Sequence, residues 1–87
     1  MHVLIVDDHP LYREGMKSLL SALDPEVRTS VAGDVSEALA LAKGDPPNLV
    51  LLDMGLPGSS RLDALREVKA ACAAASVVVV SGDEDPT

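Results

Sequence analysis

The chain has 87 residues, 47% of them apolar, and a formal net charge of −7 at pH 7. This length allows one small domain, and the apolar share is that of a globular chain. The net negative charge argues against binding of nucleic acid, because binding its phosphates requires a basic surface. The single cysteine, Cys72, excludes an internal disulfide and a cysteine-based zinc site. With no secretory signal and no apolar run long enough to span a bilayer, a cytoplasmic protein without membrane contact is expected.

The first part of the chain predicts a strand, a helix and a second strand. Residues 3–6 form a short apolar run, which is typical of a buried parallel strand. Pro10 suits the first position of a helix, and Asp24-Pro25 ends it. Residues 27–31 predict an edge strand, because polar and apolar residues alternate there. The helix carries an apolar stripe that we expect to pack in the core: Tyr12, Met16, Leu19, Leu20 and Leu23.

The second part repeats the alternation of helix and strand. Asp34 and Glu37 are spaced as a capping box for a second helix, and Gly44 fits its C-terminal cap. Residues 49–52 predict a central third strand. Ser60 and Asp63 are spaced as another capping box, opening a helix that runs to residue 71, and residues 77–80 predict a fourth strand. Strands that alternate with helices imply an α/β fold with a parallel sheet.

Carboxylates follow two of the predicted strands directly. Asp7 and Asp8 come after the first apolar run, and Asp53 comes after the third. In open α/β sheets, residues just past the carboxyl ends of neighbouring strands converge on one crevice. Like charges there repel by about 4 kcal/mol per pair at about 4 Å and an effective dielectric constant of about 20. A hard divalent cation held by oxygens is the usual way to offset such repulsion.

Several neighbouring residues have a structural interpretation that competes with a functional one. His9 could ligate a metal or accept phosphate, but a histidine beside a proline is more often a surface or cap residue. Ser81 by itself is typical of a turn residue that follows a strand. Cys72 is expected to be a half-buried small hydrophobe near a helix end.

In combination, these motifs resemble the receiver domain of two-component response regulators of the NarL/LuxR type. The resemblance is carried by residues 6–15 (VDDHPLYREG), 53–58 (DMGLPG) and 80–82 (VSG). It implies a flavodoxin-like, doubly wound parallel sheet, incomplete here, with about four strands and three helices present.

The resemblance also implies a role for individual residues. Asp53 would accept a phosphoryl group from a histidine kinase. Asp8 and Asp53 would bind Mg²⁺ directly, together with the backbone carbonyl of Gly55, and Asp7 would bind it through water. Ser81 would be the switch hydroxyl that hydrogen-bonds the phosphoryl oxygen. The function expected is phosphorelay signalling in a transcriptional regulator.

A regulatory phosphoacceptor is favoured over an enzyme. The only catalysis expected of it is that of its own phosphotransfer and dephosphorylation. Phosphatases with an aspartyl nucleophile carry two aspartates with one residue between them after a single strand, a pattern that is absent here. A phosphate-cradling glycine-rich loop is absent as well.

The chain stops at Thr87, where the resemblance would place a further helix. Residues 1–87 are therefore expected to be a partial receiver domain, without the family's fourth helix, its fifth strand with a lysine, its fifth helix and any DNA-binding domain. An alternative expectation is a phosphorylation-deficient module that associates with itself or with a partner. A homo-oligomer would form through the exposed edge of the strand at 77–80 or through an uncovered sheet face.

Overall fold

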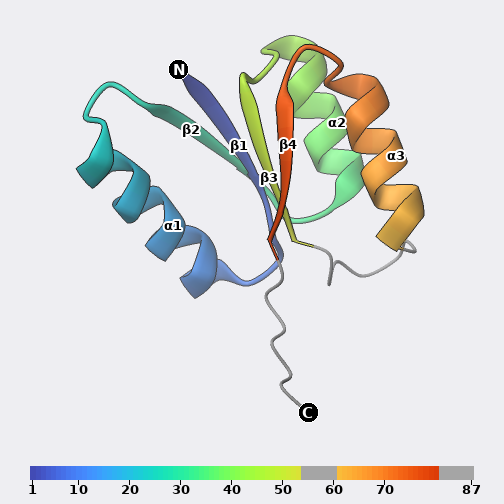
Figure 1. The fold of residues 1–87 in the computed structure, drawn as a ribbon. Coiled ribbons are helices and arrows are strands. Elements are labelled where there is room, and N and C mark those ends of the chain that lie inside the picture. The colour runs from blue at the N-terminus through green and yellow to red at the C-terminus, as the bar shows by residue number, and fades with distance from the viewer. Residues whose placement is uncertain (54–60, 81–87) are drawn as a thin grey trace.

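The computed structural model describes residues 1–53 and 61–80. They form an α/β fold in which a parallel sheet lies between helices, with α1 on one face and α2 and α3 on the other (Figure 1). The order of the strands in the sheet is β2-β1-β3-β4. The elements, in chain order, are β1 (His2–Val6), α1 (Pro10–Leu23), β2 (Arg28–Ala32), α2 (Val35–Gly44), β3 (Leu49–Asp53), α3 (Arg61–Ala71) and β4 (Ser76–Val80).

The register of the sheet brings the carboxyl ends of β1 and β3 to the same edge. Val6 lies opposite both Ala32 and Leu52, and Asp53 lies opposite Val80. The backbone N–H of Asp7 then donates to the carbonyl of Ala32 at 2.9 Å. This bond holds the chain in line with the sheet for one residue beyond β1, so Asp7 and Asp53 both face the edge where the strands end.

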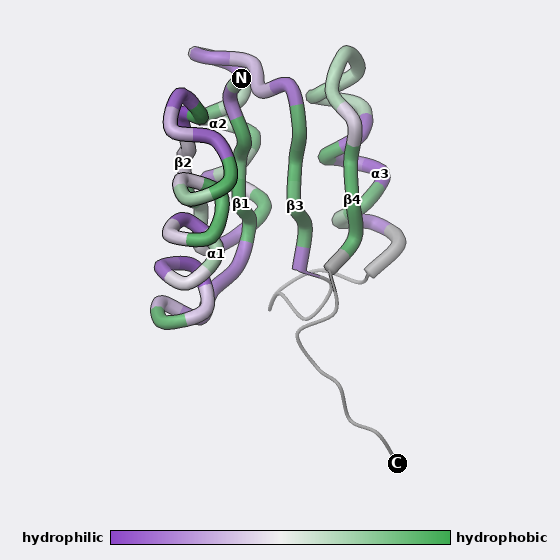
Figure 2. The backbone as a smooth tube through the Cα atoms, turned by 60° about the vertical axis from the view of Figure 1, so that its left-hand side comes forward, coloured by the Kyte–Doolittle hydropathy of each residue, from purple (hydrophilic) through white to green (hydrophobic). Residues whose placement is uncertain are grey.

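The main core lies between the sheet and the pair α2 and α3. Strand residues alternate between the two faces, and the alternate positions of β1 and β3 that face these helices are fully buried. Figure 2 shows the hydrophobic stretches of these strands and their hydrophilic lower ends. The buried cluster consists of Leu4, Val6, Ala32, Val35, Ala38, Ala42, Val50, Leu52, Ala64, Val68 and Cys72.

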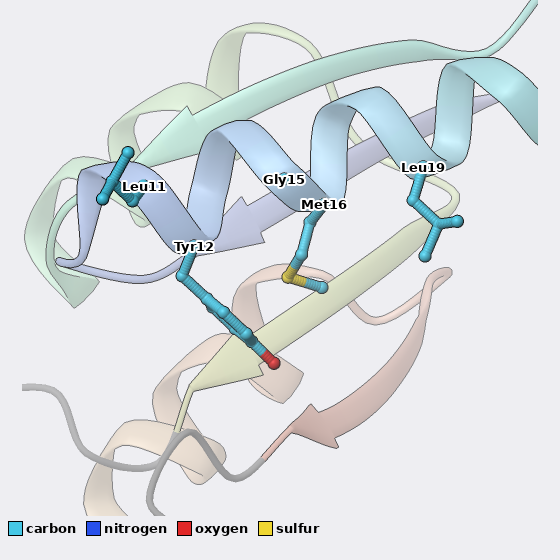
Figure 3. A pocket seen from close by; sticks show the side chains of 5 residues that line it. All are labelled: Leu11, Tyr12, Gly15, Met16 and Leu19. Atoms are coloured by element: carbon cyan, nitrogen blue, oxygen red, sulfur yellow. The ribbon is translucent and has the colours of Figure 1, made fainter.

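The expectation that the stripe on α1 packs in the core is wrong. No residue of α1 is buried, and Leu19 is 61% exposed. Tyr12, Met16 and Leu19 project from the same side of the helix and line an apolar pocket of about 370 Å³ with Leu11 and Gly15 (Figure 3). Helical periodicity identifies the apolar side of a helix, but whether that side is covered depends on what the rest of the fold places against it.

The helix termini follow the sequence closely. Pro10 opens α1, and the Asp34 carboxylate accepts a hydrogen bond from the Glu37 N–H at 2.8 Å, as the capping box predicts. The Glu37 carboxylate accepts from the N–H of Gly33 at 2.8 Å, one residue before the cap. Gly44 is the last residue of α2, and the cap itself is Asp45.

Three smaller expectations can be compared with the structure. The second strand begins and ends one residue later than predicted, at 28–32. Cys72 is buried rather than half-buried, at 6% exposure, because it belongs to the same apolar cluster as Val68. Ser60, the proposed cap of α3, lies outside the described residues.

Candidate metal centre

The aspartates predicted to converge do lie together. Asp7 and Asp8 follow β1 directly, and Asp53 is the last residue of β3. One ligand atom from each of these residues and one from His9 all lie within 4.8 Å of one another. Parallel pairing of two short apolar strands is sufficient to produce this arrangement, since both strands end at the same edge of the sheet.

Burial divides the cluster into an inner and an outer half. Asp7 and Asp53 are 1% and 3% exposed, whereas the side chain of His9 is 66% exposed. Asp8 is also accessible to solvent. The inner carboxylates are therefore shielded from bulk water, and a small ion or group could reach them past Asp8 and His9.

Asp7 is fixed by the turn that leads into α1. Its Oδ1 accepts the backbone N–H of His9 at 2.8 Å and lies 3.0 Å from His9 Nδ1. Its Oδ2 is buried and accepts no hydrogen bond from any residue that the structure describes. A buried carboxylate oxygen without a donor is costly, and coordination of a cation is one way to satisfy it.

The imidazole of His9 lies among the carboxylates. Its Nδ1 is 3.1 Å from Asp8 Oδ1 and 3.8 Å from Asp53 Oδ2, in addition to the contact with Asp7. The hydrogen bond with Asp7 and then the negative charge of Asp8 raise the pKa of His9 above its ordinary value. When it is protonated, the ring is the nearest positive charge to the three carboxylates among the described residues.

Arg13 supports the site from α1, a role that the sequence did not reveal. Its Nη1 donates to the backbone carbonyl of Asp7 at 3.3 Å, and its backbone N–H donates to the carbonyl of His9 at 3.0 Å. The only sequence signal was a basic residue one helical turn after the acidic pair. Arg13 therefore ties the first turn of α1 to the end of β1.

The donor set fits a divalent cation. Carboxylate oxygens are the ligands that Mg²⁺ and Ca²⁺ prefer, and three carboxylates supply enough negative charge. The buried Oδ2 of Asp7 is the local observation that favours a cation here. Of the remaining residues predicted for the site, Gly55 and Ser81 lie outside the described residues.

The fold and this cluster define an α/β domain with an acidic crevice at the carboxyl edge of a parallel sheet. Comparison with known proteins gives its family. The family of response regulator receiver domains matches residues 3–87, so the chain belongs to this family. As the sequence predicted, it is a receiver domain of two-component response regulators, with a flavodoxin-like fold.

Curated relatives include response regulators. The nitrate/nitrite response regulator NarL of Escherichia coli (strain K12) is 34% identical over 82 residues, which are 91% of this chain and 37% of that protein. The nitrate/nitrite response regulator NarP of the same strain is 38% identical over 80 residues, with the same coverage of 91% and 37%. The chain thus spans just over a third of the length of these relatives.

Solved structures agree on the fold. A two-component response regulator of the LuxR family from Aurantimonas sp. SI85-9A1 superposes with a TM-score of 0.81 at 30% identity, over 95% of this chain and 59% of that one. The MaeR response regulator bound to beryllium trifluoride has a TM-score of 0.84 at 20% identity, over 98% of this chain and 70% of that one. None of the helices in the described part of the chain is long and apolar enough to cross a membrane.

Proposed function

We propose that Asp53 accepts a phosphoryl group from a histidine kinase, with Mg²⁺ held by Asp7, Asp8 and Asp53, in a phosphorelay that controls transcription. The observation that carries this proposal is the meeting of the three carboxylates, from the ends of β1 and β3, within 4.8 Å at one edge of the sheet. Membership of the receiver family supports it, because receivers act in two-component signalling.

The transfer requires a nucleophile that is held still and shielded from bulk water. A carboxylate oxygen of Asp53 attacks the phosphorus of a phosphohistidine, the P–O bond forms, and the P–N bond breaks with its electron pair passing to the imidazole of the kinase. Asp53 lies at the end of a central strand, where burial shields its carboxylate from bulk water. Phosphoryl transfer depends mainly on alignment and charge neutralisation, and Mg²⁺ supplies the latter when bound.

The ligand roles follow from the resemblance and are compatible with the observed burial. Asp8 and Asp53 would bind the ion directly, and Asp7 would bind it through water. The backbone carbonyl of Gly55 would complete the set, and the hydroxyl of Ser81 would hydrogen-bond the phosphoryl oxygen. The last two roles concern residues outside the described ranges and rest on the resemblance alone.

Intact mass tests the proposal. The chain is incubated with Mg²⁺ and a small phosphodonor, and the mass of the wild type is compared with that of Asp53→Asn and Asp45→Asn. Asp45 is an exposed carboxylate, paired with Arg28 at the opposite end of the sheet, and makes a matched control. We expect the wild type and D45N to gain one phosphoryl group and D53N to gain none. A gain that D53N retains would refute Asp53 as the acceptor.

A second role, self-association, is favoured by the exposure of apolar side chains on β4. Val78 and Val79 are 46% and 45% exposed, and β4 is the outermost strand of the described sheet on its side. Exposed apolar strands at a sheet edge promote pairing with another chain.

A further inference from the structure

We propose that His9 supplies an imidazole nitrogen to the cation site, so that the site binds divalent transition-metal ions through its carboxylates and one nitrogen. This inference rests on the cation site of the proposed function and adds one ligand to it. His9 then determines which metals the site selects, while the carboxylates provide the affinity that is common to all divalent ions.

The positions of the donor atoms are the first observation. The Nδ1 atom of His9 lies 3.0 Å from Asp7 Oδ1, 3.1 Å from Asp8 Oδ1 and 3.8 Å from Asp53 Oδ2. Two ligands of one ion with bonds of about 2.0–2.2 Å are about 3–3.5 Å apart in tetrahedral or octahedral geometry. The nitrogen therefore already lies at ligand-to-ligand distances from Asp7 and Asp8, and it is a few tenths of an ångström farther from Asp53.

The buried oxygen of Asp7 is the second, independent observation. Asp7 is 1% exposed, and its Oδ2 accepts no hydrogen bond from the described part of the chain. Its Oδ1, in contrast, is occupied by the backbone and ring of His9. A cation between Asp7 and the imidazole would satisfy this oxygen, and the ring could turn toward it freely, because His9 is largely exposed.

The mixed donor set determines the class of ion. Carboxylate oxygens suit Mg²⁺, Ca²⁺ and Mn²⁺, whereas imidazole suits Zn²⁺, Ni²⁺ and other transition metals. Mg²⁺ keeps several of its waters and gains little from a nitrogen ligand. An ion that accepts imidazole gains a further protein ligand, and a protonated His9 releases a proton to solvent as it binds. The site should therefore favour transition ions over Mg²⁺.

Calorimetric titration with Co²⁺ and with Mg²⁺ tests this inference on the wild type and on His9→Gln. The exposed position of His9 means that H9Q should fold, which circular dichroism verifies. We expect H9Q to weaken Co²⁺ binding by at least about tenfold, the lower end of the loss seen when a supporting partner of a metal ligand is removed. Mg²⁺ binding should stay within about threefold, since its ligands are oxygens.

Proton NMR provides a readout that a purely structural role of His9 would not change. With Co²⁺ bound, imidazole ring protons should be strongly shifted by the unpaired electrons, and these signals should vanish in H9Q. His2→Gln removes the other histidine, which lies at the opposite end of β1 and hydrogen-bonds Ser30 at 2.7 Å. The shifted signals should persist in H2Q.

Equal loss of Co²⁺ and Mg²⁺ affinity in H9Q, or unchanged Co²⁺ affinity, would overturn the role of His9. Either result is compatible with phosphorylation of Asp53 in the presence of Mg²⁺. Failure of the proposed function has a different signature, because the wild type would gain no phosphoryl group whatever its affinity for Co²⁺.

Discussion

Among the residues of the crevice, His9 is the one whose surroundings the sequence predicted least well. A histidine before a proline suggested a surface or cap position, and His9 does occupy the position before α1 without a side-chain cap bond. Its ring nevertheless contacts all three carboxylates. The contacts with Asp7 and Asp8 are local, since the Asp7 carboxylate accepts the backbone N–H of His9 two residues on. The approach to Asp53, in contrast, depends on the pairing of β1 with β3.

The pKa of His9 in metal-free protein should lie above its ordinary value of 6.5. The hydrogen bond with Asp7 and the charge of Asp8 both favour the protonated ring. Asp7→Asn should lower this pKa, because a neutral amide attracts the imidazolium less strongly. An NMR titration of the ring protons measures both values, and a wild-type pKa at or below 6.5 would contradict the geometry.

The raised pKa of His9 also determines whether the contribution of this residue to stability rises or falls with pH. A folded-state pKa above the unfolded value means that the contribution of His9 is fully present below about pH 6.5. It is lost as the pH rises through the folded-state pKa. Because His9 is exposed to solvent, this contribution should be screened by salt.

At the scale of the elements, the start of α2 follows the sequence closely, since capping is a local interaction. The Asp34 carboxylate accepts the free N–H of Glu37 at its start, as their spacing predicted. The reciprocal bond of Glu37 to Gly33 rather than to the cap residue was not predicted, and it extends the capped segment one residue toward β2.

Asp34→Ala should therefore destabilise the protein by about 1 kcal/mol, the typical cost of losing an N-cap side chain. Ser36→Ala, at an exposed position in the first turn of the same helix, is the matched control and should change the free energy of unfolding by less than about 0.5 kcal/mol. Chemical denaturation of both variants measures the difference. Equal losses would show that the bond from Glu37 contributes nothing specific.

At the scale of the whole molecule, the two faces of the sheet differ in how well they are covered. The face toward α2 and α3 carries the continuous buried cluster, whereas α1 on the other face has no buried residue. Leu11, Leu19 and Leu23 are exposed on α1, and Val78 lies on the same face of the sheet as this helix.

This asymmetry predicts unequal costs for truncating apolar side chains. Val68→Ala removes two buried methyl groups, which at about 0.8 kcal/mol each and with a cavity left behind should cost about 2 kcal/mol. Leu19→Ala removes more atoms, yet should cost at most about 0.5 kcal/mol because the side chain is already largely exposed. Urea denaturation of the two variants measures both costs. A larger loss for Leu19→Ala than for Val68→Ala would contradict the prediction and would show that α1 is packed as tightly as α3.

The exposed apolar surface on the α1 side also predicts self-association. Sedimentation velocity over a range of concentrations should show a dimer or larger species, because uncovered apolar patches on soluble proteins mark contact sites. Val78→Lys should shift the distribution toward monomer. Ser36→Lys makes the same change in charge on the opposite side of the sheet and should leave it unaltered. A wild type that stays monomeric at every concentration would exclude this role.

The sequence by itself determined the order of strands and helices and the edge at which the aspartates meet. These features depend on short apolar runs, capping residues and the rule that parallel strands end on one side, all of which are local or topological. Only the tertiary structure decided the burial of Asp7, the approach of His9 to Asp53 and the exposure of α1. Those features depend on how distant segments pack against one another, and periodicity along the chain carries no information about the partner that a side chain will meet.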